Sequence, residues 1–177
     1  MLKVEEDMNW YPKLYLNNVK EITPEILKKY QLKGLILDVD NTLIDYHKNI
    51  LVGAQKWIKQ MEQEGIKLCI VSNSNQKEKV EKVAQKLEIP YIYFAFKPLK
   101  FGFHKAQKIM QLESNQIGVV GDQILTDVIG ANRCHMFSIL VKPLHEKDIW
   151  ITKLKRPLEN KIIQKYEKYK QEENIKK

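Results

Sequence analysis

The chain has 177 residues, of which 44% are hydrophobic, and a formal net charge of +8. This length can bury one substantial core but not two, so we expect a single domain over residues 1–177, with its core at about 30–142. No apolar run approaches the roughly 20 residues that span a bilayer, and the acidic N-terminus is unlike a signal peptide. A membrane-spanning class and a secreted class are therefore excluded, and we expect a cytoplasmic protein.

The most informative apolar run is Gly34–Leu37, which leads directly into two carboxylates, Asp38 and Asp40. A short run that is apolar on every side predicts a central strand of a parallel sheet with both faces covered. Ligands of such open sheets bind beyond the carboxyl ends of the strands. Two carboxylates this close repel each other, so a cation, a proton or a neighbouring lysine is needed to hold them together. A hard divalent ion such as Mg2+ is the natural candidate. The alternative is that Asp38 caps a turn and the next residues form an ordinary loop.

Three later strand ends also carry polar groups. The second expected strand ends in a hydroxyl and an amide before a helical pattern, a place where small polar side chains and backbone N–H groups can cradle a phosphate. A lysine follows the third strand, and two carboxylates follow the fourth. In chain order these side chains are Ser72 with Asn73, Lys97, and Asp122 with Asp127. The expected strands, alternating with helices in a three-layer parallel architecture, are 34–38, 67–72, 91–94, 117–121 and 136–141.

Lysine is abundant in this chain, so the cation at the third strand end needs an argument of its own. Lys97 precedes Pro98, which favours an extended backbone at the lysine. Lys100 is the nearby rival. We select Lys97 as the cation beside the acidic residues.

This series of strand ends resembles the haloacid dehalogenase (HAD) superfamily of phosphohydrolases, over about residues 34–132. The segment Asp38–Leu43 is similar to the first motif, DxDxT, and Asp-Asn-Thr-Leu with Lys97-Pro98 looks like subclass III. The other matches are Ser72 to the second-motif Ser/Thr, Lys97 to the third-motif lysine, and Gly121-Asp122 with Asp127 to the acidic fourth motif. Flanking segments around Pro12, 19–22 and 155–159 look like the YqeG family, which includes phosphatidylglycerophosphate phosphatases. The resemblance implies an α/β/α sandwich with a central parallel sheet of the HAD-like Rossmannoid type.

The resemblance also implies a reaction, the hydrolysis of a phosphomonoester through an aspartyl phosphate. Asp38 would be the nucleophile, and Asp40 would act as general acid and then as general base. Ser72 and Asn73 would bind the phosphate oxygens, while Lys97 would neutralise charge in the transition state.

The implied cofactor is Mg2+, which would offset the charge of phosphate and carboxylates. It would be held by Asp38, the main-chain carbonyl of Asp40 and Asp122, with Asp127 in support. The four histidines lack metal-ligand spacing, and the two cysteines form no CxxC pair.

The spacing of the motifs predicts an open site without a large cap domain. Between Asp38 and Ser72 there is room only for a flap at 44–51 and one helix at 52–64. An open site can accept a phosphate carried on a large body, such as a lipid in a membrane. Nothing in the sequence identifies a headgroup pocket, for which Asp45, Tyr46 and His47 are candidates.

The basic C-terminal segment, at about 143–177, mixes lysines with apolar residues, Trp and Tyr. It suits an anionic membrane interface, but the same apolar face could pack on the sheet with its lysines in solvent. We therefore expect phosphatidylglycerophosphate at an anionic membrane surface as the substrate. The alternatives are a soluble sugar or nucleotide phosphate and a catalytically silent binding protein, although such a protein would be expected to lack Asp38 or Asp40. The lysines are dispersed, so no nucleic-acid partner is expected, and the oligomeric state stays open.

Overall fold

The computed structural model describes residues 10–145 and 150–175, and the residues of the predicted basic segment at 146–149 and 176–177 lie outside the described residues. Its centre is one six-stranded sheet in the order β1-β6-β5-β2-β3-β4, in which all neighbouring strands are parallel. The strands are β1 (Leu14–Leu16), β2 (Gly34–Leu37), β3 (Lys67–Val71), β4 (Tyr91–Ile92), β5 (Ile117–Gly121) and β6 (Phe137–Val141).

The five predicted strands are all present, and one strand was not predicted. The extra strand is β1, which pairs with β6 through Leu14 and Ile139 at the edge of the sheet. The third predicted strand, 91–94, is only two residues long, because the chain turns away from the sheet after Ile92. The predicted parallel α/β architecture is confirmed.

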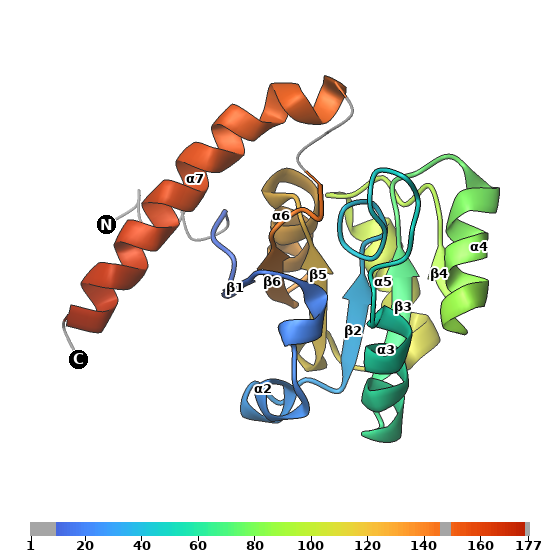
Figure 1. Cartoon of the computed structure of the whole chain (residues 1–177). Helices are drawn as coiled ribbons and strands as arrows, with labels where there is room; N and C mark the ends of the chain where they lie inside the picture. Colours follow the sequence, from blue (N-terminus) through green and yellow to red (C-terminus); the bar gives the residue numbers. More distant parts are fainter. Residues whose placement is uncertain (1–9, 146–149, 176–177) are drawn as a thin grey trace.

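Helices cover both faces of the sheet (Figure 1). On one face, α2 (Pro24–Lys29), α3 (Ala54–Gln63) and α4 (Lys77–Leu87) share an apolar cluster with Leu35 and Leu37 of β2. On the other, α5 (Lys100–Met110) and α6 (Ile129–Arg133) pack with Ile36 of the same strand. Successive side chains of β2 thus point to opposite faces, and both faces are buried, which explains its uninterrupted apolar sequence. Three short helical segments lie between these elements: η1 (Val19–Glu21), η2 (Ser114–Gln116) and η3 (Ile124–Val128).

Helix α4 shows how the sequence produces these layers. Its buried residues are Val80, Val83, Ala84 and Leu87, whose three- and four-residue spacing forms one stripe along the helix. The helix ends where Glu88 adopts a left-handed conformation, at φ 59°. The chain enters α4 directly after β3, so the N-terminus of this helix lies at the carboxyl edge of the sheet, beside the end of β3.

The connection between β2 and β3 contains a short flap and α3. An isolated antiparallel bridge between Ile44 and Ile50 closes the flap, which lies over the carboxyl end of β2 in Figure 1. All residues from Asp38 to Ser72 are described, and no cap domain is inserted among them.

The C-terminal helix α7 (Trp150–Ile175) packs on the core over part of its length. Ile162 is buried against Ile124, Val128 and Leu140, and the carboxylate of Glu159 accepts a hydrogen bond from the Leu125 backbone N–H at 3.1 Å. The packing alternative therefore holds for these side chains, and membrane contact by the segment stays a prediction. Among the described helices, none combines the length and the apolar character needed to cross a bilayer.

Candidate active site

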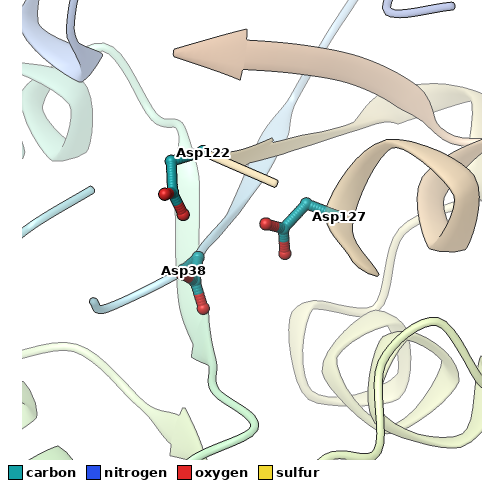
Figure 2. Close-up of side chains that lie close together, drawn as sticks. All are labelled: Asp38, Asp122 and Asp127. Carbon is teal, nitrogen blue, oxygen red and sulfur yellow. The ribbon is translucent and has the colours of Figure 1, made fainter. Parts of the chain in front are cut away.

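Three carboxylates meet at the carboxyl edge of the sheet. Asp38 follows β2, Asp122 follows the neighbouring strand β5, and Asp127 lies in η3. Oxygen atoms of the three side chains lie within 4.8 Å of one another, and all three residues are buried. Figure 2 shows the three side chains close together, with Asp38 and Asp127 coming from different chain segments. The structure thus brings together three predicted site residues that are up to 89 positions apart in the chain.

Lys97 supplies the positive charge in this acidic cluster. Its Nζ lies 2.5 Å from Oδ1 of Asp38 and 2.7 Å from Oδ1 of Asp127, and its side chain is 3% exposed. Its rival Lys100 is exposed at the start of α5. The geometry therefore favours Lys97 as the cation of the site.

Burial and charge shift the pKa values of this pair. Burial raises the pKa of the Asp38 carboxyl to about 7. The positive charge of Lys97 lowers this pKa, but the negative charges of Asp127 and Asp40 raise it and oppose the effect of Lys97. Burial alone would lower the pKa of the Lys97 ammonium, but Asp127 and Asp38 outweigh it and raise that pKa above its ordinary value. Lys97 therefore remains protonated among carboxylates whose charges it only partly balances.

Asn73 holds the backbone of Lys97. Its amide donates to the Lys97 carbonyl at 2.9 Å, and its side-chain oxygen accepts from the Lys97 N–H at 2.6 Å. In the structure both polar atoms of the Asn73 side chain contact the Lys97 backbone, and the predicted role of Asn73 as a phosphate ligand stays a prediction. Ser72 is buried beside it, and its hydroxyl oxygen accepts from the Ser74 N–H at 3.1 Å. The hydroxyl hydrogen of Ser72 can still be donated to a phosphate oxygen.

Asp40 has a cationic partner that the sequence analysis missed. Both of its carboxylate oxygens accept hydrogen bonds from Lys79 Nζ, at 2.8 and 2.7 Å. The Asp40 side chain is 42% exposed, unlike the enclosed side chain of Asp38. A cation in the first turn of a helix is unfavourable because it opposes the helix dipole. The place of Lys79 in the first turn of α4 was therefore the sequence feature that could have indicated an acidic partner.

Gly121 creates the space that Asp127 occupies. A Cβ at position 121 would lie 2.2 Å from Cγ of Asp127, so any other residue would displace this carboxylate. The second oxygen of Asp127 accepts from the Gln123 N–H at 3.2 Å. The turn after β5 therefore aims Asp127 at the cluster.

The donor set suits a hard divalent cation. Asp38, Asp122 and Asp127 offer carboxylate oxygens from separate chain segments, and only one of their negative charges is balanced by Lys97. Oxygen donors of this kind are those that Mg2+ prefers.

The flap and the segment after β6 bring three aromatic rings together. The rings of Tyr46, His47 and His145 have centroids 5.6 to 6.2 Å apart. Asp45, another predicted headgroup candidate, instead accepts a hydrogen bond from the Asn49 N–H at 2.8 Å within the flap. Tyr46 and His47 thus remain candidates for substrate contact.

Comparison with known protein families shows to which family the chain belongs. The model of the family described as mitochondrial PGP phosphatase matches residues 3–144. The chain belongs to this PGP phosphatase family. The probable phosphatase YqeG of Bacillus subtilis (strain 168) is 40% identical over 153 residues, which are 86% of this chain and 88% of that protein. The chain is accordingly a phosphatase, that is, a phosphoric monoester hydrolase, and the alternative of a catalytically silent binding protein loses its support.

Solved structures show the same fold at low sequence identity. An uncharacterized protein from Listeria monocytogenes serotype 4b has a TM-score of 0.54 at 21% identity, over 67% of this chain and 85% of that one. The cobalt-bound deoxy-D-mannose-octulosonate 8-phosphate phosphatase of Haemophilus influenzae has a TM-score of 0.53 at 15% identity, over 78% and 91% of the two chains. At this level of sequence identity, the similarity concerns the fold alone.

Proposed function

We propose that this phosphatase is Mg2+-dependent and converts phosphatidylglycerophosphate into phosphatidylglycerol through an aspartyl phosphate. The observation that carries the mechanism is the buried cluster of Asp38, Asp122 and Asp127 around Lys97. Membership in the PGP phosphatase family supports the substrate.

In the first step, a carboxylate oxygen of Asp38 attacks phosphorus. The bond between phosphorus and the alcohol oxygen breaks, and Asp40 gives its proton to that oxygen. In the second step, Asp40 takes a proton from a water molecule, whose oxygen attacks phosphorus and breaks the bond to Asp38. Inorganic phosphate leaves, Asp38 is again a carboxylate, and Asp40 again carries the proton that it donates in the first step.

Other residues of the chain position the phosphoryl group. The hydroxyl of Ser72 would donate to a non-reacting oxygen, and the Lys97 ammonium would offset negative charge in the transition state. Asp38, Asp122 and the main-chain carbonyl of Asp40 would hold Mg2+, with Asp127 in support. The ion, when bound, supplies further positive charge beside the phosphate.

A basic groove adjoins Asp40 and supports a substrate with a second anionic group. It has a volume of about 370 Å3, and Lys79, which binds Asp40, forms part of its wall. A phosphodiester is the second anion of phosphatidylglycerophosphate, and lysine ammonium groups would attract it. The lining residues are Lys48, Ile50, Gln76, Glu78, Lys79, Lys82, Val83 and Lys86.

The test measures Mg2+-dependent phosphate release by the purified protein and by Asp38→Asn. Phosphatidylglycerophosphate in mixed micelles is compared with soluble sugar, nucleotide and amino-acid phosphates. We expect the highest kcat/KM with the lipid and loss of activity in Asp38→Asn. Preference for a soluble phosphate would refute the lipid substrate, and activity that survives in Asp38→Asn would refute the mechanism.

A further inference from the structure

An unusual set of exposed apolar side chains lies next to the active site. Five of the eleven large hydrophobic residues that are exposed in the described part of the chain fall within the nine residues 93–101. Their exposed fractions run from 40% to 66%. We call this set the aromatic rim; its members are Tyr93, Phe94, Phe96, Leu99 and Phe101.

The segment that carries the aromatic rim has an inner and an outer side. Ala95 and Lys97 are buried, and Lys97 enters the acidic cluster. Phe94 and Phe96 lie on the outer side, with their ring centroids 4.2 Å apart. The same short segment thus presents a catalytic cation to the interior and two adjacent, mutually tilted rings to the solvent.

The backbone holds these rings outward in a costly conformation. Phe94 and Phe96 have φ angles of 51° and 55°, in the left-handed region that bulky residues rarely adopt. For residues other than glycine this conformation is less favourable than right-handed backbone. The loop is nevertheless fixed, because the Phe94 N–H donates to the Ser74 carbonyl at 3.0 Å and the Ala95 N–H to the Ser72 carbonyl at 3.0 Å. Strained conformations that the surrounding structure maintains are concentrated at functional sites.

A lysine-rich surface lies near the aromatic rim, and the β3–α4 loop connects the two. The β3–α4 loop contributes Ser74, which binds Phe94, and Gln76, which lines the basic groove. That groove carries four lysines against one acidic residue, Glu78. The carboxyl edge of the sheet therefore combines exposed aromatic rings, an adjoining lysine-rich surface and the entrance to an uncapped site.

We propose that the aromatic rim docks on an anionic lipid bilayer and inserts Phe94 and Phe96 into its interfacial region. Peripheral membrane segments bury Trp, Phe and Leu side chains at the boundary between headgroups and acyl chains, and lysines near an anionic surface strengthen such binding. Docking by this edge turns the active site toward the membrane. The proposal rests on the proposed lipid substrate for its purpose, while its test requires no catalysis.

The first test measures binding of the full-length protein to vesicles made of equal parts phosphatidylglycerol and phosphatidylcholine, without any phosphomonoester. The double variant Phe94→Asn, Phe96→Asn removes the rings with a residue that tolerates positive φ, so it should remain folded by circular dichroism. We expect its vesicle partition coefficient to fall about tenfold, equivalent to about 1.4 kcal/mol. The matched control is Ile109→Gln.

The control removes an exposed apolar side chain at the opposite edge of the sheet. Ile109 is 46% exposed near the end of α5, where Lys67 at the start of β3 donates to the Met110 carbonyl. We expect Ile109→Gln to bind vesicles like the wild type. Equal binding by the double variant and the wild type would overturn the proposal, as would failure of the wild-type protein to bind. Self-association through the rings in place of vesicle binding would also overturn it.

A second measurement tests insertion directly. The two cysteines, Cys69 and Cys134, are buried, so an environment-sensitive fluorophore can be attached selectively to Phe96→Cys or to Ile109→Cys. We expect a blue shift with vesicles at position 96 but not at 109, and equal spectra would contradict insertion. Vesicle binding without phosphatidylglycerophosphate hydrolysis would refute the proposed substrate and leave the docking surface standing.

Discussion

The variant Asp38→Asn should become more stable than the wild-type protein as the pH rises. Among the described residues, Asp38 is buried with two other carboxylates and the Lys97 ammonium, and this burial makes its negative charge unfavourable in the metal-free protein. Asparagine keeps the shape and removes the charge. The expected effect on the free energy of unfolding follows from the raised pKa of Asp38.

In the unfolded chain the Asp38 carboxyl has its ordinary pKa of 3.8, whereas the folded protein raises it to about 7. Between these pH values the folded protein holds a proton that the unfolded chain has lost, so a rise in pH destabilises the fold. This contribution is complete below pH 3.8 and is lost as the pH rises through 7. At about 1.4 kcal/mol per pKa unit, the full change is about 4 kcal/mol.

The assay is urea unfolding of both proteins in EDTA, from pH 5 to pH 8. All other titrating groups are shared, so we expect the difference in unfolding free energy to grow in favour of Asp38→Asn over this range. Asp45→Asn is the control, because backbone and side-chain hydrogen bonds from Asn49 lower the pKa of the exposed Asp45 carboxyl. Its effect falls at more acidic pH, and its difference from wild type should stay flat. A flat difference for Asp38→Asn would refute the reasoning.

Three further substitutions test the contacts of the site. Lys97→Met should destabilise the metal-free protein by about 3–5 kcal/mol, since it leaves buried carboxylates without their cation, and added Mg2+ should restore part of this in urea unfolding. Lys79→Met removes both hydrogen bonds that orient the Asp40 carboxyl group, so proton donation by Asp40 should become less efficient. We therefore expect kcat to fall more for alkyl phosphates than for p-nitrophenyl phosphate, whose leaving group needs little protonation. Gly121→Ala places a Cβ 2.2 Å from Cγ of Asp127, and calorimetry should show at least tenfold weaker Mg2+ binding.

Each of these variants has a matched control in the chain. Lys100→Met removes an exposed lysine near Lys97 and should leave stability unchanged. Lys82→Met removes another lysine of the basic groove and should not alter the ratio between the two leaving groups. Gly118 lies in the same strand as Gly121, and Gly118→Ala places a Cβ against Leu35 instead of the acidic cluster. Mg2+ affinity should therefore persist in this variant. A variant that behaves like its control would contradict the assigned contact.

The sequence was sufficient to predict the sheet and the place of the site. Runs such as 34–37 are buried on both faces, and parallel strands bring the residues that follow them to one edge. Asp38, Asp122 and Lys97 could therefore be grouped from the sequence alone. Strand β1 could not be predicted, because three half-buried residues show too little periodicity.

Contacts that depend on loop geometry were beyond the sequence. The role of Asn73 depends on two hydrogen bonds to a residue 24 positions away, and Lys79 finds Asp40 only because α4 begins beside the flap. The aromatic rim was hidden in a run that reads as a buried strand. Positive φ angles at Phe94 and Phe96 turn those side chains outward, and hydrophobic pattern carries no signal for this backbone.

The measurement that tests the central claim most directly is capture of the phosphoenzyme. The protein is mixed with phosphatidylglycerophosphate micelles and Mg2+, quenched in acid during the first turnover, digested, and analysed by mass spectrometry. The account predicts a phosphoryl group on Asp38, which is absent without Mg2+ and in Asp38→Asn. A phosphoryl group on another residue, or phosphate release by Asp38→Asn at the wild-type rate, would contradict it.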